Sequence, residues 1–254
     1  MTTKNKGLPP ALGGPSPFPR RRSGPGCGMC ASCDVREYTF CAALSPQEMG
    51  SIEAIVRSVR LAPGQILFQE GEEASDVFNL VRGVVKLYKL LPDGRRQITG
   101  FLFPGDFLGI AGAGGYSYNA EAVTETGLCR FPRRQLFALF ERFPKLEHRL
   151  FAIATDELTA AQDQMLLLGR KTAEEKVASF LCRLADRFDL GETRGGEVPV
   201  PMTRSDIGDY LGLTVETVSR TLSRLRKRGL IAVPDVNRVV LLRREAIEEI
   251  AEAY

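Results

Sequence analysis

The stretch TRSDIGDYLGLTVETVSRTLSRLRKR, residues 203–228, decides the fold of the C-terminal part of the chain. Gly212 divides it into two short segments, and glycine suits the left-handed position that ends a helix. Apolar residues recur in both segments at the spacings of three and four that bury one helix face, namely Ile207, Tyr210 and Leu211, then Val215, Val218, Leu222 and Leu225. The stretch therefore predicts two helices joined by a tight turn, a helix-turn-helix.

The second predicted helix carries side chains that can read DNA bases. Thr214 is placed to cap its N-terminus, and Glu216, Ser219 and Arg220 share the face opposite the apolar one. An arginine can donate to guanine O6 and N7, and a carboxylate can accept from cytosine N4. A plain solvated helix is the alternative, but the presence of a glutamate among basic side chains favours contact with the DNA bases. We predict that these three residues contact double-stranded DNA.

Basic residues at both ends of the stretch suit phosphate binding. Arg226 and Arg228 belong to a cationic run after the base-reading face. The residues expected to contact phosphate most directly are Thr203, Arg204, Arg224 and Lys227. Because the net charge is only +3, this binding depends on local patches rather than on overall basicity.

The composition indicates a non-secreted globular protein and excludes several function classes. A length of 254 residues allows one or two domains, and 44% hydrophobic with 26% charged residues is ordinary for a soluble chain. No apolar run approaches the ~20 residues of a membrane span, and no secretion signal is visible, so a cytoplasmic protein without membrane contact is expected. The single histidine, His148, leaves little room for histidine-based catalysis. An enzyme is not expected.

A cysteine-rich segment, CGMCASCDVREYTFC, spans residues 27–41 and contains Cys27, Cys30, Cys33 and Cys41. Cysteines in a non-secreted chain favour metal or redox chemistry over disulfides. Thiolates are ligands for zinc and for iron-sulfur clusters, and spacing alone leaves the choice of metal open. Cys182, within the apolar run VASFLCRL, is expected in the core instead.

The middle of the chain predicts short strands and then a long helix. From about Leu61 to Phe131, β-rich runs alternate with glycine turns, which is typical of a jelly-roll barrel. A helix is expected from about Pro144 to Leu168, with an uncharged stripe at coiled-coil spacing: Phe151, Ala154, Leu158, Ala161, Met165 and Leu168. A dimer seam is the favoured interpretation, because a two-fold symmetric dimer reads two half-sites. The alternative is a helix packed on its own barrel.

The run LGLTVETVSRTLSRL resembles the recognition motif of the CRP/FNR family of transcription regulators. The pattern Glu216-x-x-Ser219-Arg220 is similar to the FNR version, whereas the cyclic-AMP receptor branch has an arginine and a glycine where Val215 and Ser219 stand here. The resemblance implies a homodimer, a TTGAT-type half-site, and an RNA polymerase contact through the turn from Pro92 to Arg96. A plain hairpin is the other interpretation of that turn.

The same resemblance implies a [4Fe-4S] cluster and oxygen sensing. A subgroup of the family has the spacing C-x2-C-x7-C, which matches Cys30, Cys33 and Cys41, and Cys129 stands where the family's fourth ligand stands. Cys27 is an additional cysteine and is not expected to be a ligand. The arginine that pairs with the phosphate of a cyclic nucleotide is missing, so no cyclic nucleotide is expected.

The predicted organisation is α+β: a disordered tail (1–26), a cysteine-bearing segment with a cyclic-nucleotide-binding-like β-barrel (27–143), a dimerisation helix (144–170) and a winged helix-turn-helix (171–254). The expected function is an oxygen-responsive transcription regulator. A constitutive or redox-responsive regulator with a structural zinc site of four cysteines is one alternative. A cysteine-dependent redox enzyme is another, but it needs an activated thiol beside a base, and none is visible.

Overall fold

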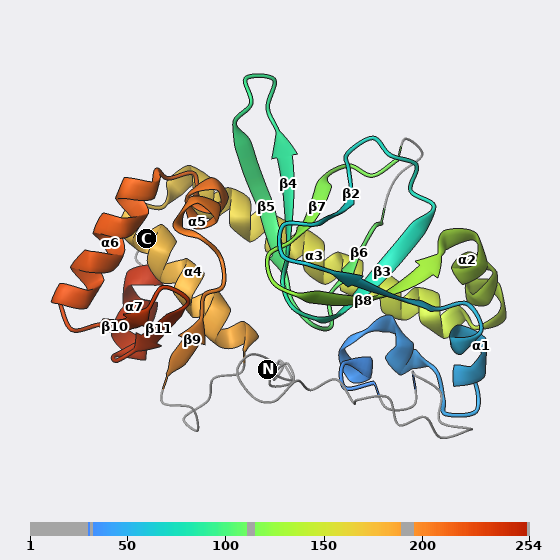
Figure 1. Ribbon diagram of the computed structural model, residues 1–254. Helices are drawn as coiled ribbons and strands as arrows, with labels where there is room; N and C mark the ends of the chain where they lie inside the picture. Colours follow the sequence, from blue (N-terminus) through green and yellow to red (C-terminus); the bar gives the residue numbers. More distant parts are fainter. Residues whose placement is uncertain (1–29, 31–32, 111–114, 189–195, 253–254) are drawn as a thin grey trace. The chain divides into compact units, whose positions relative to one another are not determined.

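The computed structural model describes residues 30, 33–110, 115–188 and 196–252, which form two compact units (Figure 1). Among the described residues, one unit comprises 30, 33–89, 100–110 and 115–159, and the other comprises 90–99, 160–188 and 196–252. The expected tail (1–26) and Cys27 lie outside the described residues. No helix within the described ranges is both long and apolar enough to cross a membrane.

The first unit contains most of two four-stranded sheets, with the orders β1-β8-β3-β6 and β2-β7-β4-β5, while the end of the β4–β5 hairpin, residues 90–99, belongs to the second unit. The bounds are β1 Arg57–Leu61, β2 Ile66–Phe68, β3 Asp76–Arg82, β4 Val85–Leu90, β5 Arg96–Leu102, β6 Phe107–Leu108, β7 Asn119–Ala122 and β8 Thr126–Pro132. β8 pairs antiparallel with both β1 and β3. The predicted β-barrel is therefore present, although β1 lies almost entirely before the start that the sequence suggested.

Strand alternation divides the core of this unit into two clusters. Phe78 and Leu80 of β3 face a cluster inside the barrel, with Leu128 of β8. Val77 of the same strand and Phe131 of β8 face a second cluster on the opposite side of the sheet. Side chains at the odd-numbered positions of β3 therefore point toward the cysteine-bearing segment, which belongs to the second cluster.

The described part of the cysteine-bearing segment and the residues after it form short helices: η1 Arg36–Tyr38, η2 Phe40–Ala43 and α1 Met49–Glu53. Phe40 is fully buried and packs edge-on against Phe107 at a centroid distance of 5.5 Å and against Phe131 at 5.3 Å. These aromatic contacts hold the segment against the β1-β8-β3-β6 sheet.

Two further helices follow the barrel: α2 Arg133–Arg142, which the sequence did not reveal, and α3 Pro144–Arg170. The predicted long helix is confirmed, and α3 ends at Arg170. Leu146, Leu150 and Ile153 on one face of α3 pack into the cluster that contains Cys30 and Cys41. The N-terminal half of α3 therefore shares a core with the cysteine-bearing segment.

The second unit is a winged helix-turn-helix built from α4 Ala173–Arg187, β9 Glu197–Pro199, α5 Arg204–Leu211, α6 Val215–Lys227, β10 Ile231–Asp235, β11 Arg238–Leu241 and α7 Arg244–Glu252. The wing sheet has the order β10-β11-β9, and β9 was not expected from the sequence. Thr172 caps α4 through a capping box with Glu175. Cys182 of α4 is half-buried, so its predicted place in the core is only partly confirmed.

Candidate metal centre and nucleic-acid interface

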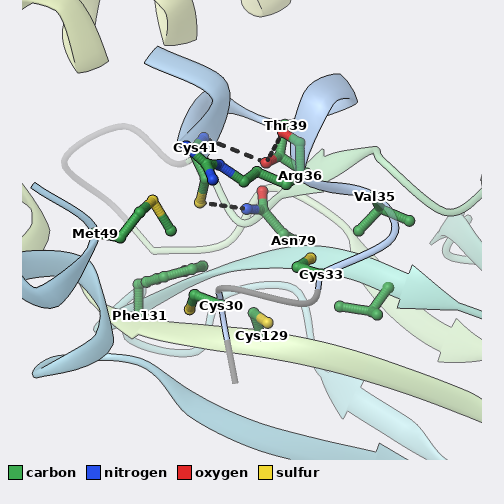
Figure 2. A pocket seen from close by; sticks show the side chains of 11 residues that line it. Cys30, Cys33, Val35, Arg36, Thr39, Cys41, Met49, Asn79, Cys129 and Phe131 are labelled. Carbon is green, nitrogen blue, oxygen red and sulfur yellow. Dashed lines mark hydrogen bonds between the residues drawn. The ribbon is translucent and has the colours of Figure 1, made fainter. Parts of the chain in front are cut away.

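Four cysteines from three segments line one cavity in the first unit (Figure 2). Cys30 and Cys33 precede η1, Cys41 lies in η2, and Cys129 lies in β8. The other lining residues are Val35, Arg36, Thr39, Met49, Asn79, Val81 and Phe131. All four sequence-predicted ligands therefore meet at one place, although Cys129 is 88 positions from Cys41 in the sequence (129 − 41).

The cavity favours the neutral thiol form of its cysteines while no cation is bound. Burial raises the pKa of Cys30 to about 12 and that of Cys41 to about 11. Burial also raises the pKa of Cys33, and it raises that of Cys129 most strongly, with further contributions from the other three thiols. A bound cation is what stabilises four thiolates in such a place, because ligand thiols lose their protons on metal binding.

Four cysteine thiols are a donor set that an iron-sulfur cluster or a single zinc ion can use. Within the described ranges, no three His, Cys, Asp or Glu side chains converge closely enough to hold one metal ion. Tetrahedral zinc needs four sulfurs at ~2.3 Å from one point. A [4Fe-4S] cluster distributes its four cysteine ligands over separate irons, so the sulfurs need not converge.

Hydrogen bonds fix the backbone around the cavity. The Cys30 N–H donates to Glu53 Oε1 at 3.1 Å, and the Cys41 N–H donates to Thr39 Oγ1 at 3.2 Å. The Arg36 guanidinium donates to the Leu44 carbonyl oxygen at 2.7 Å, which braces the segment that carries Cys41. These contacts fix the backbone positions of Cys30 and Cys41.

Sequence reasoning missed the polar residues of this cavity other than the cysteines, namely Arg36, Thr39 and Asn79. The Asn79 amide Nδ2 donates to Cys41 Sγ at 3.7 Å (Figure 2). Nothing in the cysteine spacing points to any of them. The asparagine within the apolar strand VFNLV was an available signal, because asparagine is depleted in strands.

The helix-turn-helix has the predicted caps and turn. Gly212 ends α5 in the left-handed conformation at φ 63°. The Thr214 hydroxyl accepts a hydrogen bond from the Thr217 N–H at the start of α6. Thr203 caps α5 through a capping box with Asp206, whose carboxylate accepts from the Thr203 N–H at 3.1 Å.

The predicted apolar faces are buried with one exception. Val215 is 42% exposed, whereas Val218, Leu222 and Leu225 are buried. The prediction for Val215 was wrong because it is the first residue of α6, at the exposed end of the helix. Thr221 is buried in the same face instead.

The predicted base-reading residues Glu216, Ser219 and Arg220 are exposed on α6. Of the predicted phosphate contacts, Thr203 and Lys227 are exposed and Arg204 is half-buried. Arg224 lies 3.3 Å from Glu174 of α4, which also pairs with Arg228. Glu174 is a further residue that the sequence did not single out, and it neutralises part of the basic run.

The α3 stripe exposes large apolar side chains. Phe151 is 74% exposed, Leu158 is 59% exposed and Met165 is 66% exposed. Ala161 is exposed as well, and Ala154 and Leu168 are half-buried. The stripe therefore lies on a different face from the residues that pack against the cysteine-bearing segment, as a seam for a second copy requires.

Comparison with known proteins places both units in one family. Residues 58–143 match the model of the cyclic nucleotide-binding domain, and residues 175–250 match that of the Crp-like helix-turn-helix domain. The transcriptional activatory protein AadR of Rhodopseudomonas palustris is 47% identical over 209 residues, which cover 82% of this chain and 87% of that protein. The fumarate and nitrate reduction regulatory protein of Salmonella typhi is 35% identical over 218 residues, 84% and 87% of the two chains.

A solved structure agrees with these relatives. FixK2 from Bradyrhizobium japonicum superimposes with a TM-score of 0.73 and 38% identity, over 79% of this chain and 99% of that one. The nitrogen fixation regulation protein FixK of Bradyrhizobium diazoefficiens is 42% identical over 204 residues, 80% of this chain and 86% of that protein. The chain therefore belongs to the CRP/FNR family of transcription regulators, and it is a DNA-binding regulator rather than an enzyme.

Proposed function

We propose that this regulator responds to oxygen through a [4Fe-4S] cluster held by Cys30, Cys33, Cys41 and Cys129. The observation that carries the proposal is the meeting of these four cysteines at one cavity. Their thiols face no histidine or competing carboxylate among the residues that line the cavity. When bound, the cluster supplies chemistry that is sensitive to oxygen.

The chain's own residues connect this site to the dimer helix. Cys30 and Cys41 share a hydrophobic cluster with Leu146 of α3, and the exposed stripe lies on another face of that helix. A cluster bound by all four cysteines would connect the cysteine-bearing segment, which carries Cys30, Cys33 and Cys41, to β8, which carries Cys129. Cluster binding can favour the active dimer only through a higher affinity for that state. The hydrophobic core that the cysteine-bearing segment shares with α3 supports such a difference in affinity between the two states.

The proposed DNA target is a palindrome with TTGAT-type half-sites, one for each α6 of a homodimer. The exposed triad Glu216, Ser219 and Arg220 supports base reading. The hairpin turn between β4 and β5 is proposed to contact RNA polymerase. In that turn Arg95 is 77% exposed and forms an ion pair with Asp93 at 2.7 Å.

No cyclic nucleotide is part of this proposal. Aromatic rings occupy the core inside the barrel: Phe68 stacks on Tyr116 at a centroid distance of 3.7 Å, and both side chains are buried. The Tyr116 hydroxyl donates to the Asp76 carbonyl oxygen at 2.8 Å, which fixes that ring. This filled interior supports a role for the domain as a scaffold for the cysteines.

The deciding experiment is anaerobic purification followed by an absorption spectrum with iron and acid-labile sulfide analysis. We expect a coloured protein that contains iron and sulfide, binds its DNA site, and loses both colour and affinity in air. A colourless protein with zinc and no sulfide would instead identify the constitutive, zinc-containing regulator.

A further inference from the structure

Asn79 is a buried polar residue whose amide is only half used among the described residues. It lies in β3 and is 2% exposed. Its Nδ2 donates to Cys41 Sγ at 3.7 Å, and its Oδ1 is buried without a hydrogen-bond partner among the described residues. Most buried polar side-chain atoms have a partner, so an orphaned oxygen at a cavity wall is a sign of function.

The strand register places Asn79 between two of the candidate ligands. Asn79 is the direct cross-strand partner of Cys129 in the β3–β8 pair, and its side chain reaches Cys41 (Figure 2). Directly opposite residues in an antiparallel pair have neighbouring side chains. Asn79 therefore adjoins the cysteine from the barrel and a cysteine from the N-terminal segment.

A second buried asparagine in the same unit shows what a structural asparagine looks like. Asn119 of β7 is 8% exposed, and both ends of its amide are used. Its Oδ1 accepts from the Glu70 N–H at 3.2 Å, and its Nδ2 donates to the Tyr88 carbonyl oxygen at 3.2 Å. Hydrogen bonds to the backbone account for the burial of Asn119, whereas the side-chain hydrogen bond of Asn79 goes to a cysteine sulfur.

We propose that Asn79 is a positioning residue of the cluster site, which donates its amide N–H to the sulfur of Cys41 and thereby sets the reduction potential of the bound cluster. The inference rests on the proposed cluster. An N–H donated to a coordinating thiolate draws negative charge from the sulfur, and this stabilises the reduced, more negative form of the cluster. Asn79 therefore raises the potential and slows the loss of electrons to oxygen.

The test compares Asn79→Leu, which keeps the approximate volume without a donor, with Asn79→Asp, which keeps the shape but places a carboxylate beside the sulfur. Both are purified without oxygen and titrated for reduction potential, with iron and sulfide analysis. We expect a more negative potential in Asn79→Leu, a larger shift in Asn79→Asp, and several-fold faster bleaching in air. Asn119→Leu is the matched control and is expected to lower thermal stability while leaving the potential unchanged.

The different failures are distinguishable. A wild-type protein without iron and sulfide contradicts the proposed cluster and the role of Asn79 together. A wild-type protein with a cluster whose potential is unchanged in Asn79→Leu contradicts the role of Asn79 alone. If Asn79→Leu does not fold, Asn79→Asp decides in the same way. Equal shifts in Asn79→Leu and Asn119→Leu would mean that general loosening of the barrel, and not the hydrogen bond, sets the potential.

Discussion

Arg96, the first residue of β5, forms an ion pair with Asp206, the carboxylate that closes the capping box of α5. Its Nη2 lies 2.9 Å from Asp206 Oδ1 and 2.7 Å from Asp209 Oδ2. Asp206 also accepts from the Thr203 hydroxyl at 2.6 Å and is 4% exposed. Arg96 therefore neutralises a buried carboxylate at the start of the helix-turn-helix, and residues 90–99 belong to the DNA-binding unit.

Replacement of Arg96 by alanine is expected to destabilise this unit by about 1–3 kcal/mol, because it leaves a buried carboxylate short of a partner. Chemical denaturation followed by far-ultraviolet circular dichroism measures the effect. The neighbouring Arg95→Ala is the matched control and is expected to change little, because Arg95 and Asp93 form an exposed pair. Equal effects of the two substitutions would show that Asp206 does not depend on Arg96.

Serine substitution at Cys30, Cys33, Cys41 or Cys129 is expected to abolish iron retention, because each removes one of four ligands. Cys27→Ser and Cys182→Ser are expected to retain iron. Iron and sulfide analysis after anaerobic reconstitution gives the answer. A Cys27→Ser protein that loses iron, beside a Cys30→Ser protein that keeps it, would mean that the N-terminal ligands are misassigned by one cysteine.

Arg220→Ala is expected to remove discrimination at the half-site guanine, worth ~1–3 kcal/mol for a bidentate contact. Lys227→Ala is expected to weaken binding to every sequence alike and to flatten the salt dependence, because it removes a phosphate contact. Binding titrations on matched and altered half-sites separate the two effects. Uniform weakening by Arg220→Ala would assign Arg220 to phosphate instead.

Glu174→Gln is expected to strengthen binding to every DNA sequence and to steepen its salt dependence. Glu174 pairs with Arg224 and Arg228, and its neutralisation leaves both guanidinium groups to the phosphates. Glu248→Gln, which breaks a comparable exposed pair with Arg244, is the control. Weaker binding by Glu174→Gln would show that the acid holds the two arginines in their DNA-binding positions.

Ala161→Asp is expected to shift the protein toward monomer, because the new carboxylates would meet across the two-fold axis and lose water. Thr159→Asp introduces the same charge on another face of α3 and is expected to leave assembly unchanged. The uncharged stripe also predicts measurable dimerisation of the cluster-free protein at micromolar concentrations. Sedimentation of the aerobic protein tests this, and a monomer throughout that range would show that the stripe alone does not hold the dimer.

The sequence by itself determined the local architecture of this protein. The spacing of apolar residues around Gly212 predicted α5, the turn and α6, because helix periodicity and capping are properties of neighbouring residues. The same reasoning found α3 and its exposed stripe. The prediction that Val215 is buried was wrong: Val215 has the spacing of the apolar face, but it lies at the exposed end of α6.

Only the tertiary structure decided which distant residues share a site. The sequence grouped Cys27, Cys30, Cys33 and Cys41, and the family resemblance added Cys129. The pairing of β3 with β8 is what places Cys129 opposite Asn79 and beside the same cavity. The ion pairs of Glu174 with Arg228 and of Arg96 with Asp206 likewise join residues that are far apart in the sequence. Such pairs carry no periodic signal, because their partners are set by how strands and helices pack and not by their separation along the chain.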